Sequence, residues 1–199
     1  MGKASQRPDM DPQVVSSTLA DRADAVRADL VDRWGEVSHR QRDPLAVTDH
    51  EFPDDPDGVF PWVAVAFVVE DGDVLLVRDA GHDHEWEPPG GKGEPDETPA
   101  ETAEREVREE AGVDVTVTDL LFTEVLPFDY GATVTAPVLQ AGFVARRTDG
   151  RARGNEDRIE AAEWFSLGDL PDGARFRTDL DALRRSAEPV GDGSPEESR

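Results

Sequence analysis

The stretch REVREEAG, residues 105–112, carries three glutamates, Glu106, Glu109 and Glu110. The surrounding sequence indicates a helix, on which the spacings i, i+3 and i+4 place the three carboxylates on one side. Like charges placed in this way repel by ~0.2–0.5 kcal/mol per pair. The stretch therefore needs a physical reason for keeping these charges together.

The helix that contains these glutamates has clear ends. Thr98, or the residue before it, begins the helix, Pro99 suits its first turn, and Gly112 ends it. At about 100° per residue, one face is apolar and forms the packing face, made of Ala100, Ala103, Val107 and Ala111. The glutamates lie beside that face, with Glu110 nearest to it, so we expect them at the edge of the core.

Two interpretations of the acidic cluster follow from the residues alone. One is an acidic surface helix in an acidic protein. The other is a site for a divalent cation, because several carboxylates are the hard oxygen ligands that Mg²⁺ or Mn²⁺ prefers. Upstream, Gly90 and Gly91 let the backbone approach a ligand or ion closely.

The chain around this helix predicts three parts. Residues 1–57 form an N-terminal helical extension and linker, with an amphipathic helix over 16–34 capped by Ser16 or Ser17, which docks on the main domain or pairs with a second copy in a homodimer. Residues 58–185 form the main domain, and 186–199 a disordered tail. Within the main domain we expect a hairpin over 62–78 with an Asp71-Gly72 turn, a loop over 79–97, strands over 113–126, 133–146 and 161–167, and a last helix.

Composition limits the partners. The chain has 45 acidic against 21 basic residues, a net charge of −24, and only two lysines, Lys3 and Lys92. We therefore expect no nucleic acid or membrane as partner of the bulk surface, and a protein that works at high salt, as in a halophile. With no cysteine, disulfides and thiolate chemistry are excluded. The absence of a signal peptide or long apolar run predicts a cytoplasmic protein.

The glutamate stretch belongs to a longer pattern: Gly91, five residues, Glu97, seven residues, Arg105-Glu106-Val107, one residue, Glu109-Glu110, one residue, Gly112-Val113. This resembles at every fixed position the Nudix box, G-x5-E-x7-R-E-U-x-E-E-x-G-U, where U is a bulky aliphatic residue. The flanking segments WEPPGG (86–91) and EWFSLGDLP (163–171) resemble those that often precede the box and close the domain. The resemblance covers about residues 60 to 172.

The resemblance implies an α/β (α+β) Nudix fold, a mixed β-sheet sandwiched between helices. It also implies that Glu106, Glu109 and Glu110, with the Gly90 carbonyl, bind Mg²⁺ or Mn²⁺. By the same resemblance, Arg105 orients the carboxylates by ion pairing.

Two further kinds of role follow from the resemblance. Glu97 supports the geometry of the loop and helix. A general base is needed near the attacking water. Glu109 is the first candidate for it, and Glu156 and Glu160 are the candidates on a later loop.

The implied activity is hydrolysis of a pyrophosphate bond in a nucleoside diphosphate linked to another moiety, a nucleotide-derived small molecule. Pro127 resembles a feature that accompanies ADP-ribose hydrolysis and Tyr130 one that accompanies dinucleoside polyphosphates, so the two cues compete. We favour ADP-ribose or a nucleotide sugar, with dinucleoside polyphosphates and (d)NTPs as alternatives. An isomerase of this fold that uses a catalytic cysteine is excluded, whereas a non-catalytic nucleotide-sensing module is disfavoured by the intact box.

Substrate contacts are assigned to Arg78, Trp86, Gly91 and Tyr130. Two of these have ordinary alternatives, because Arg78 also suits a salt bridge and Trp86 the edge of the core. His82 and His84 are interpreted as loop residues.

Overall fold

The computed structural model describes residues 10–80, 85–154 and 157–187. Its helices and strands are, in order, α1 (Pro12–Trp34), β1 (Ser38–Gln41), β2 (Leu45–Ala46), a 3₁₀ turn (Pro56–Gly58), β3 (Trp62–Glu70), β4 (Asp73–Asp79), β5 (Trp86–Glu87), β6 (Gly90–Lys92), α2 (Pro99–Ala111), β7 (Val113–Asp129), β8 (Ala136–Gly150), β9 (Ile159–Ser166) and α3 (Arg177–Ala187). The mixed α+β class predicted from the sequence is confirmed.

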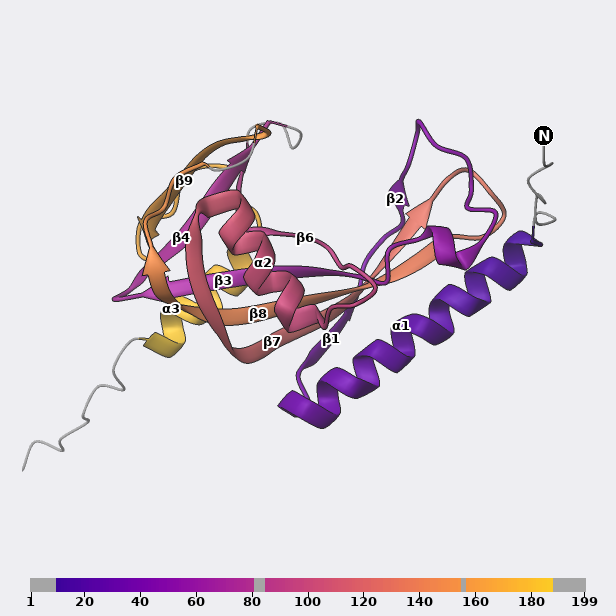
Figure 1. Cartoon of the computed structure of the whole chain (residues 1–199), viewed down its shortest axis with the longest axis horizontal. Coiled ribbons are helices and arrows are strands. Elements are labelled where there is room, and N and C mark those ends of the chain that lie inside the picture. Colours follow the sequence, from indigo (N-terminus) through magenta and orange to yellow (C-terminus); the bar gives the residue numbers. More distant parts are fainter. Residues whose placement is uncertain (1–9, 81–84, 155–156, 188–199) are drawn as a thin grey trace, which may run out of the picture.

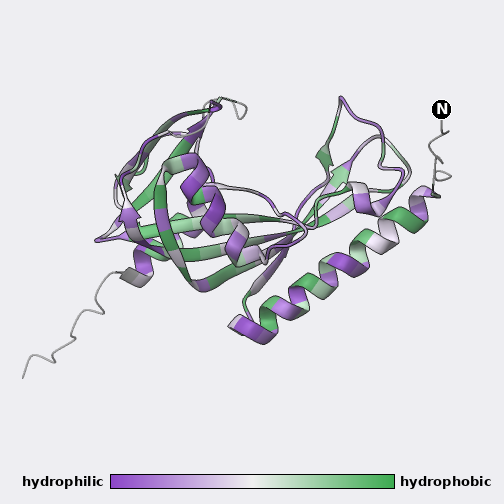
Figure 2. Cartoon of the chain, in the orientation of Figure 1, coloured by the Kyte–Doolittle hydropathy of each residue, from purple (hydrophilic) through white to green (hydrophobic). Residues whose placement is uncertain are grey.

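The strands form one mixed sheet in the order β1-β7-β8-β3-β4-β5, with β2 added on β7, β6 on β3 and β9 on β4. The β7–β8 and β3–β4 pairs are antiparallel, whereas β3–β8 and β1–β7 are parallel. Figure 2 shows that hydrophobic residues gather along the central strands, whereas α1 and α2 carry both hydrophobic and hydrophilic residues. The sheet therefore supplies most of the core.

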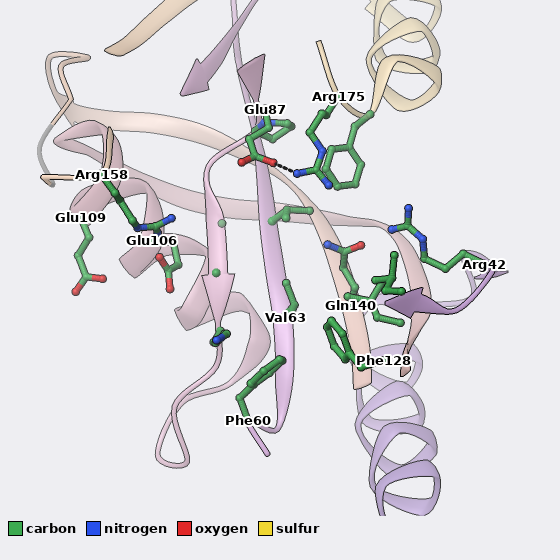
Figure 3. Close-up of a pocket in the computed structure, with 18 residues that line it drawn as sticks. Arg42, Phe60, Val63, Glu87, Glu106, Glu109, Phe128, Gln140, Arg158 and Arg175 are labelled. Atoms are coloured by element: carbon green, nitrogen blue, oxygen red, sulfur yellow. Dashed lines mark hydrogen bonds and ion pairs between the residues drawn. The ribbon is translucent and has the colours of Figure 1, made fainter. Parts of the chain in front are cut away.

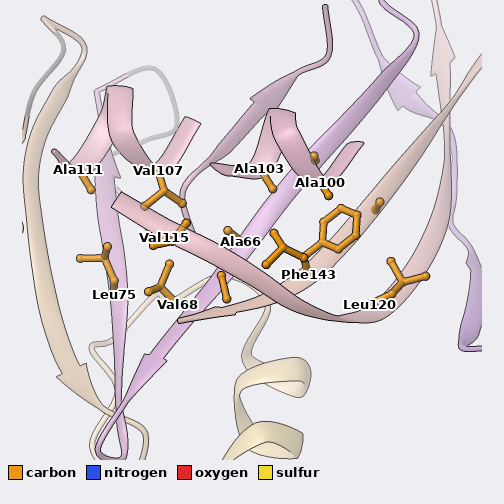
Figure 4. Packing of buried hydrophobic residues seen from close by; sticks show 14 of the residues in the cluster. Ala66, Val68, Leu75, Ala100, Ala103, Val107, Ala111, Val115, Leu120 and Phe143 are labelled. Carbon is orange, nitrogen blue, oxygen red and sulfur yellow. The ribbon is translucent and has the colours of Figure 1, made fainter. Parts of the chain in front are cut away.

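Two helices cover opposite faces of the sheet, as Figure 1 shows. Side chains alternate between the faces of a strand. In β3, Ala66 and Val68 contact the apolar side of α2, whereas Val65 and Phe67 pack with Leu180 of α3. Figure 4 shows the first of these interfaces, with the alanines and the valine of α2 above the strands. The predicted sandwich of a sheet between helices is confirmed.

Helix α2 begins and ends where the sequence predicts. The Thr98 side chain accepts a hydrogen bond from the backbone of Glu101, whose side chain accepts one from the Thr98 backbone, a complete capping box. Gly112 ends the helix at φ 66°, in the left-handed region that glycine adopts without strain. The three box glutamates are thus fixed on a helix whose ends are set by local chemistry.

The predicted hairpin is also confirmed, as β3 and β4 joined through Asp71 and Gly72, at φ 50° and 90°. Other boundaries differ. The predicted loop over 79–97 contains the short strands β5 and β6, and β7 and β8 run further than predicted, to residues 129 and 150. These extensions of β7 and β8 are stabilised by backbone pairing with neighbouring strands. Apolar periodicity does not predict such pairing.

The segment before the main domain differs most from its prediction. Helix α1 is capped by Asp11, whose side chain accepts a hydrogen bond from the Gln13 amide, and not by Ser16 or Ser17. The helix docks on β8, with Val15 and Leu19 buried. After it, β1 and β2 pair in parallel with β7. β1 is polar and β2 has only two residues, so neither strand carries an alternating apolar pattern that could predict it. In the described part of the chain, no helix is both long and apolar enough to cross a membrane.

Candidate active site

Arg105 is the centre of the acidic cluster on α2. Its Nε donates to Glu97 Oε1 at 2.7 Å, and its Nη1 donates to Glu106 Oε1 at 2.9 Å and to Glu109 Oε2 at 2.7 Å. Its Nη2 also donates to the Lys92 carbonyl at 3.0 Å, which joins the helix to the end of β6. The hydrogen bond with Glu97 is the largest cause of a raised pKa of Arg105 and also lowers the pKa of Glu97. Both groups therefore stay charged at neutral pH.

Glu110 lies on the inner side of the same helix and is only 2% exposed. Its Oε2 accepts a hydrogen bond from the Gly90 amide at 2.9 Å, and its Oε1 accepts one from Arg158 Nη2. Arg158 also donates to the buried carboxylate of Asp79, at the end of β4. Sequence reasoning missed Arg158 and Asp79. The only available signal was the position of Arg158 beside the candidate bases of the later loop.

Glu106 lies directly against the backbone of the glycine pair. A Cβ atom on Gly91 would stand 2.3 Å from Glu106 Oε1, so a side chain at position 91 would displace the carboxylate. Glu106 is 6% exposed, and its burial raises its pKa despite the nearby guanidinium of Arg105. Glu109, by contrast, keeps 43% of its side chain exposed. The helix thus presents two buried carboxylates and one that faces solvent.

Glu106 and Glu109 line a pocket of about 690 Å³. Figure 3 shows Glu106, Glu109 and Arg158 together at one end and Phe128, Gln140 and Arg42 at the other. Four cationic side chains line it, which is notable in a chain of net charge −24: Arg42, Lys92, Arg158 and Arg175. The pocket therefore combines oxygen ligands for a cation with cationic groups for an anion.

The residues present fit a hard divalent cation. Among the described residues, no three His, Asp or Glu side chains already stand together as a coordinating group. However, five carboxylates lie around Arg105 and Arg158, namely Asp79, Glu97, Glu106, Glu109 and Glu110. A Mg²⁺ or Mn²⁺ ion suits this surplus of carboxylate oxygens, since carboxylates and backbone oxygens are its usual protein ligands.

Residues 60–185 match the family described as NUDIX domain, which is more than half of the chain. The chain belongs to the Nudix family. Among similar proteins, an NAD-capped RNA hydrolase NudC of Pseudomonas aeruginosa is 40% identical over 94 residues, covering 43% of this chain and 31% of that protein. An RNA pyrophosphohydrolase of Halorhodospira halophila is 34% identical over 125 residues, covering 63% of this chain and 61% of that protein.

This Nudix chain spans less than two thirds of the length of either curated relative. Among solved structures, a NUDIX hydrolase from Nitrosomonas europaea superposes with a TM-score of 0.51 at 23% identity, covering 67% of this chain and 73% of that one. That likeness supports the fold. The Nudix box thus lies in the fold and in the helix where the family resemblance placed it.

Three of the predicted substrate contacts, Arg78, Trp86 and Tyr130, lie outside the set of residues that lines the pocket. Arg78 Nε pairs with Glu160 Oε2 at 3.1 Å, and its guanidinium lies 5.2 Å from the centre of the Trp86 ring. Trp86 packs against Phe165, and Tyr130 packs against Phe52. Gly90 and Gly91 do line the pocket, beside the box glutamates.

Some assignments fall where the structure gives no description. Glu156, a candidate base, and the loop residues His82 and His84 lie outside the described residues, as does the tail after Ala187. Sequence reasoning also missed pocket residues at the end remote from the box, chiefly Arg42 and Gln140. They come from β8 and from the segment after β1, and no local motif marks them.

Proposed function

We propose that this Nudix chain is a metal-dependent pyrophosphohydrolase that cleaves a nucleoside diphosphate linked to another moiety. The observation that carries the proposal is the arrangement around Arg105, which pairs with Glu97 and holds Glu106 and Glu109 in the lining of a pocket that four cationic side chains also line. Glu106, Glu109 and Glu110 would hold Mg²⁺ or Mn²⁺, with the Gly90 carbonyl as a further ligand.

The chain's own residues then have distinct tasks. The bound ion supplies positive charge that neutralises phosphate oxygens and lowers the pKa of an attacking water. Glu109, the exposed member of the cluster, takes the proton from that water as general base. Arg105 keeps the carboxylates oriented, and Glu97 holds Arg105 through Nε and Nη2. Arg158, at the same end of the pocket, offers a guanidinium to the phosphates of the substrate.

The pocket favours a small nucleotide-derived substrate. Its volume of about 690 Å³ is in the range of small-molecule sites and suits a dinucleotide-sized compound. We therefore keep ADP-ribose or a nucleotide sugar as the leading class, before dinucleoside polyphosphates and (d)NTPs. The names of the relatives add RNA, including NAD-capped RNA, as a second substrate class. The acidic surface of this chain opposes RNA binding, because it repels the phosphate backbone.

A substrate panel tests the proposal. Products from ADP-ribose, nucleotide sugars, dinucleoside polyphosphates, (d)NTPs and 5′-capped or triphosphorylated RNA are measured with Mg²⁺ at molar KCl, with and without EDTA. We expect turnover of one small-molecule class, abolished by EDTA. A folded protein that binds nucleotide and metal but hydrolyses none of these compounds would favour the non-catalytic sensing module.

The setting of the protein is a separate part of the proposal. Its acidic composition supports work at high salt, in a halophile cytoplasm. The predicted homodimer would use the outer side of helix α1, where Val14 is exposed. Light scattering of the full chain and of Val14→Glu, at molar KCl, tests whether a homodimer forms.

A further inference from the structure

Gln140 is a polar side chain built into the floor of the pocket. It lies on β8 with Glu124 of β7 opposite on one side and Val63 of β3 on the other. Paired residues on neighbouring strands face the same side of the sheet, so the side chains of Glu124, Gln140 and Val63 form a row on one face. Gln140 is 6% exposed and lines the pocket at the end remote from the box glutamates.

The carboxamide oxygen of Gln140 is buried and has no hydrogen-bond partner among the described residues. A buried acceptor without a donor destabilises a folded chain, and native structures contain few of them. An apolar side chain of the same length would avoid that cost. A donor that reaches this oxygen from the pocket would account for a glutamine at this position.

The surroundings of Gln140 indicate the chemistry of that donor. Phe60 and Phe128 both line the pocket, and their rings meet edge to face at 5.9 Å. In Figure 3, Phe128 and Gln140 lie at the same end of the pocket. Aromatic faces bind planar bases, and a glutamine amide reads the amino edge of adenine. A sugar hydroxyl would supply a donor without a planar ring for the aromatic pair.

We propose that Gln140 is the specificity-determining residue of this site and that its Oε1 accepts a hydrogen bond from the amino group of an adenine-type nucleobase held against Phe60 and Phe128. The inference rests on the proposed function for its orientation, with the diphosphate at Glu106 and Glu109 and the base at Gln140. Arg42 lines the same end of the pocket, so the segment before the family domain contributes a residue to the proposed base-binding site.

The direct test measures binding without turnover. Dissociation constants of AMP, purine riboside 5′-monophosphate and ribose 5-phosphate are measured by calorimetry for wild type, Gln140→Met and the control Gln13→Met, an exposed glutamine on α1. Purine riboside monophosphate lacks the amino donor, and ribose 5-phosphate lacks the base. For wild type and the control, we expect AMP to bind about tenfold more tightly than the purine analogue. In Gln140→Met that preference is lost.

Two further readouts separate this role from a structural one. Because Gln140→Met removes an unpaired buried oxygen, its melting temperature without ligand should equal or exceed that of wild type. If ADP-ribose is hydrolysed, the variant should raise KM about tenfold with little change in kcat.

An unchanged AMP preference in Gln140→Met would overturn the inference, as would wild type that binds AMP no better than ribose 5-phosphate. The first result would leave a buried water as the partner of Oε1. AMP binding that depends on Gln140 in a protein without hydrolase activity would support this inference while refuting the proposed function. Turnover of adenine substrates, with AMP binding that does not depend on Gln140, would support the proposed function while refuting this inference.

Discussion

Arg158 Nη2 donates a hydrogen bond to Glu110 Oε1, joining the residue before β9 to the buried side of α2. Glu110 is a proposed metal ligand, so a guanidinium and the metal compete for one carboxylate. Arg158 also holds Asp79, so the same side chain satisfies two buried carboxylates. A metal ion held by Glu110 would leave the Arg158 guanidinium to the phosphates of the substrate.

Arg158→Gln tests this competition. Removing the cation leaves Glu110 and Asp79 buried with less compensation, so the unfolding free energy in EDTA should fall by ~1–3 kcal/mol. Mg²⁺ should raise the unfolding free energy of the variant by more than it raises that of wild type. Urea unfolding with and without Mg²⁺ measures both terms. Arg146→Gln, an exposed arginine on β8, is the matched control. Equal Mg²⁺ stabilisation of the Arg158 variant and wild type would contradict the competition.

Glu109→Gln tests the assignment of the general base. We expect kcat to fall by ~10²–10⁴-fold, because the neutral amide cannot take the proton of the water and binds metal less well. Glu160→Gln should keep kcat within about threefold of wild type, since Glu160 is an ion-pair partner of Arg78. Glu156→Gln completes the comparison. A large loss in either later-loop variant with an active Glu109→Gln enzyme would move the base to that loop.

Glu106 should make the metal-free protein less stable as pH rises. Burial raises the pKa of Glu106 in the folded protein. The contribution of Glu106 to folding stability is therefore fully present below the ordinary pKa of a glutamate and is lost as pH rises through the raised pKa. Glu106→Gln mimics the protonated form and should be more stable than wild type by ~0.5–2 kcal/mol at pH 8 in EDTA, and equal to it near pH 4. Thermal melts across this range measure the difference. A variant less stable than wild type at pH 8 would show that the ion pair with Arg105 outweighs burial.

The ion pair of Arg40 with Asp179 ties β1 to α3. Arg40 donates two hydrogen bonds, at 2.5 and 3.0 Å, to the buried carboxylate, and its guanidinium lies 4.2 Å from the centre of the Phe122 ring. Asp179→Asn should lower the unfolding free energy by ~1–3 kcal/mol, and adding Arg40→Gln should cost less than the sum of the two changes. Exposed Asp172→Asn is the control. Strict additivity in urea unfolding would show that the pair is not coupled.

Salt should stabilise the whole chain. With a net charge of −24, repulsion among surface carboxylates acts over ~10 Å at 0.1 M salt and ~3 Å at 1 M. We expect the melting temperature to rise by about 5 °C or more between 0.1 and 2 M KCl. Tetramethylammonium chloride at equal ionic strength separates screening from specific K⁺ binding. A melting temperature independent of salt would refute adaptation to high salt.

Local chemistry explains what the sequence could predict. The capping box at Thr98, the turn at Asp71-Gly72 and the left-handed end at Gly112 involve residues only a few positions apart. Arg105 and its partner Glu109 are one helical turn apart, and its other partner, Glu97, lies at a fixed spacing in the same motif. Each of these features is therefore legible in a single stretch of sequence.

The sequence by itself determined the box helix, the hairpin and the family, because helical spacing and turn residues act within one segment. Only the tertiary structure decided which distant residues share the site. Arg158 reaches Glu110 from a later loop, and the sheet order brings Gln140, Arg42 and Phe60 to the lining of one pocket, with Gln140 left as a buried acceptor. Strand order and register come from backbone pairing and long-range packing, and neither leaves a spacing that can be read along the chain.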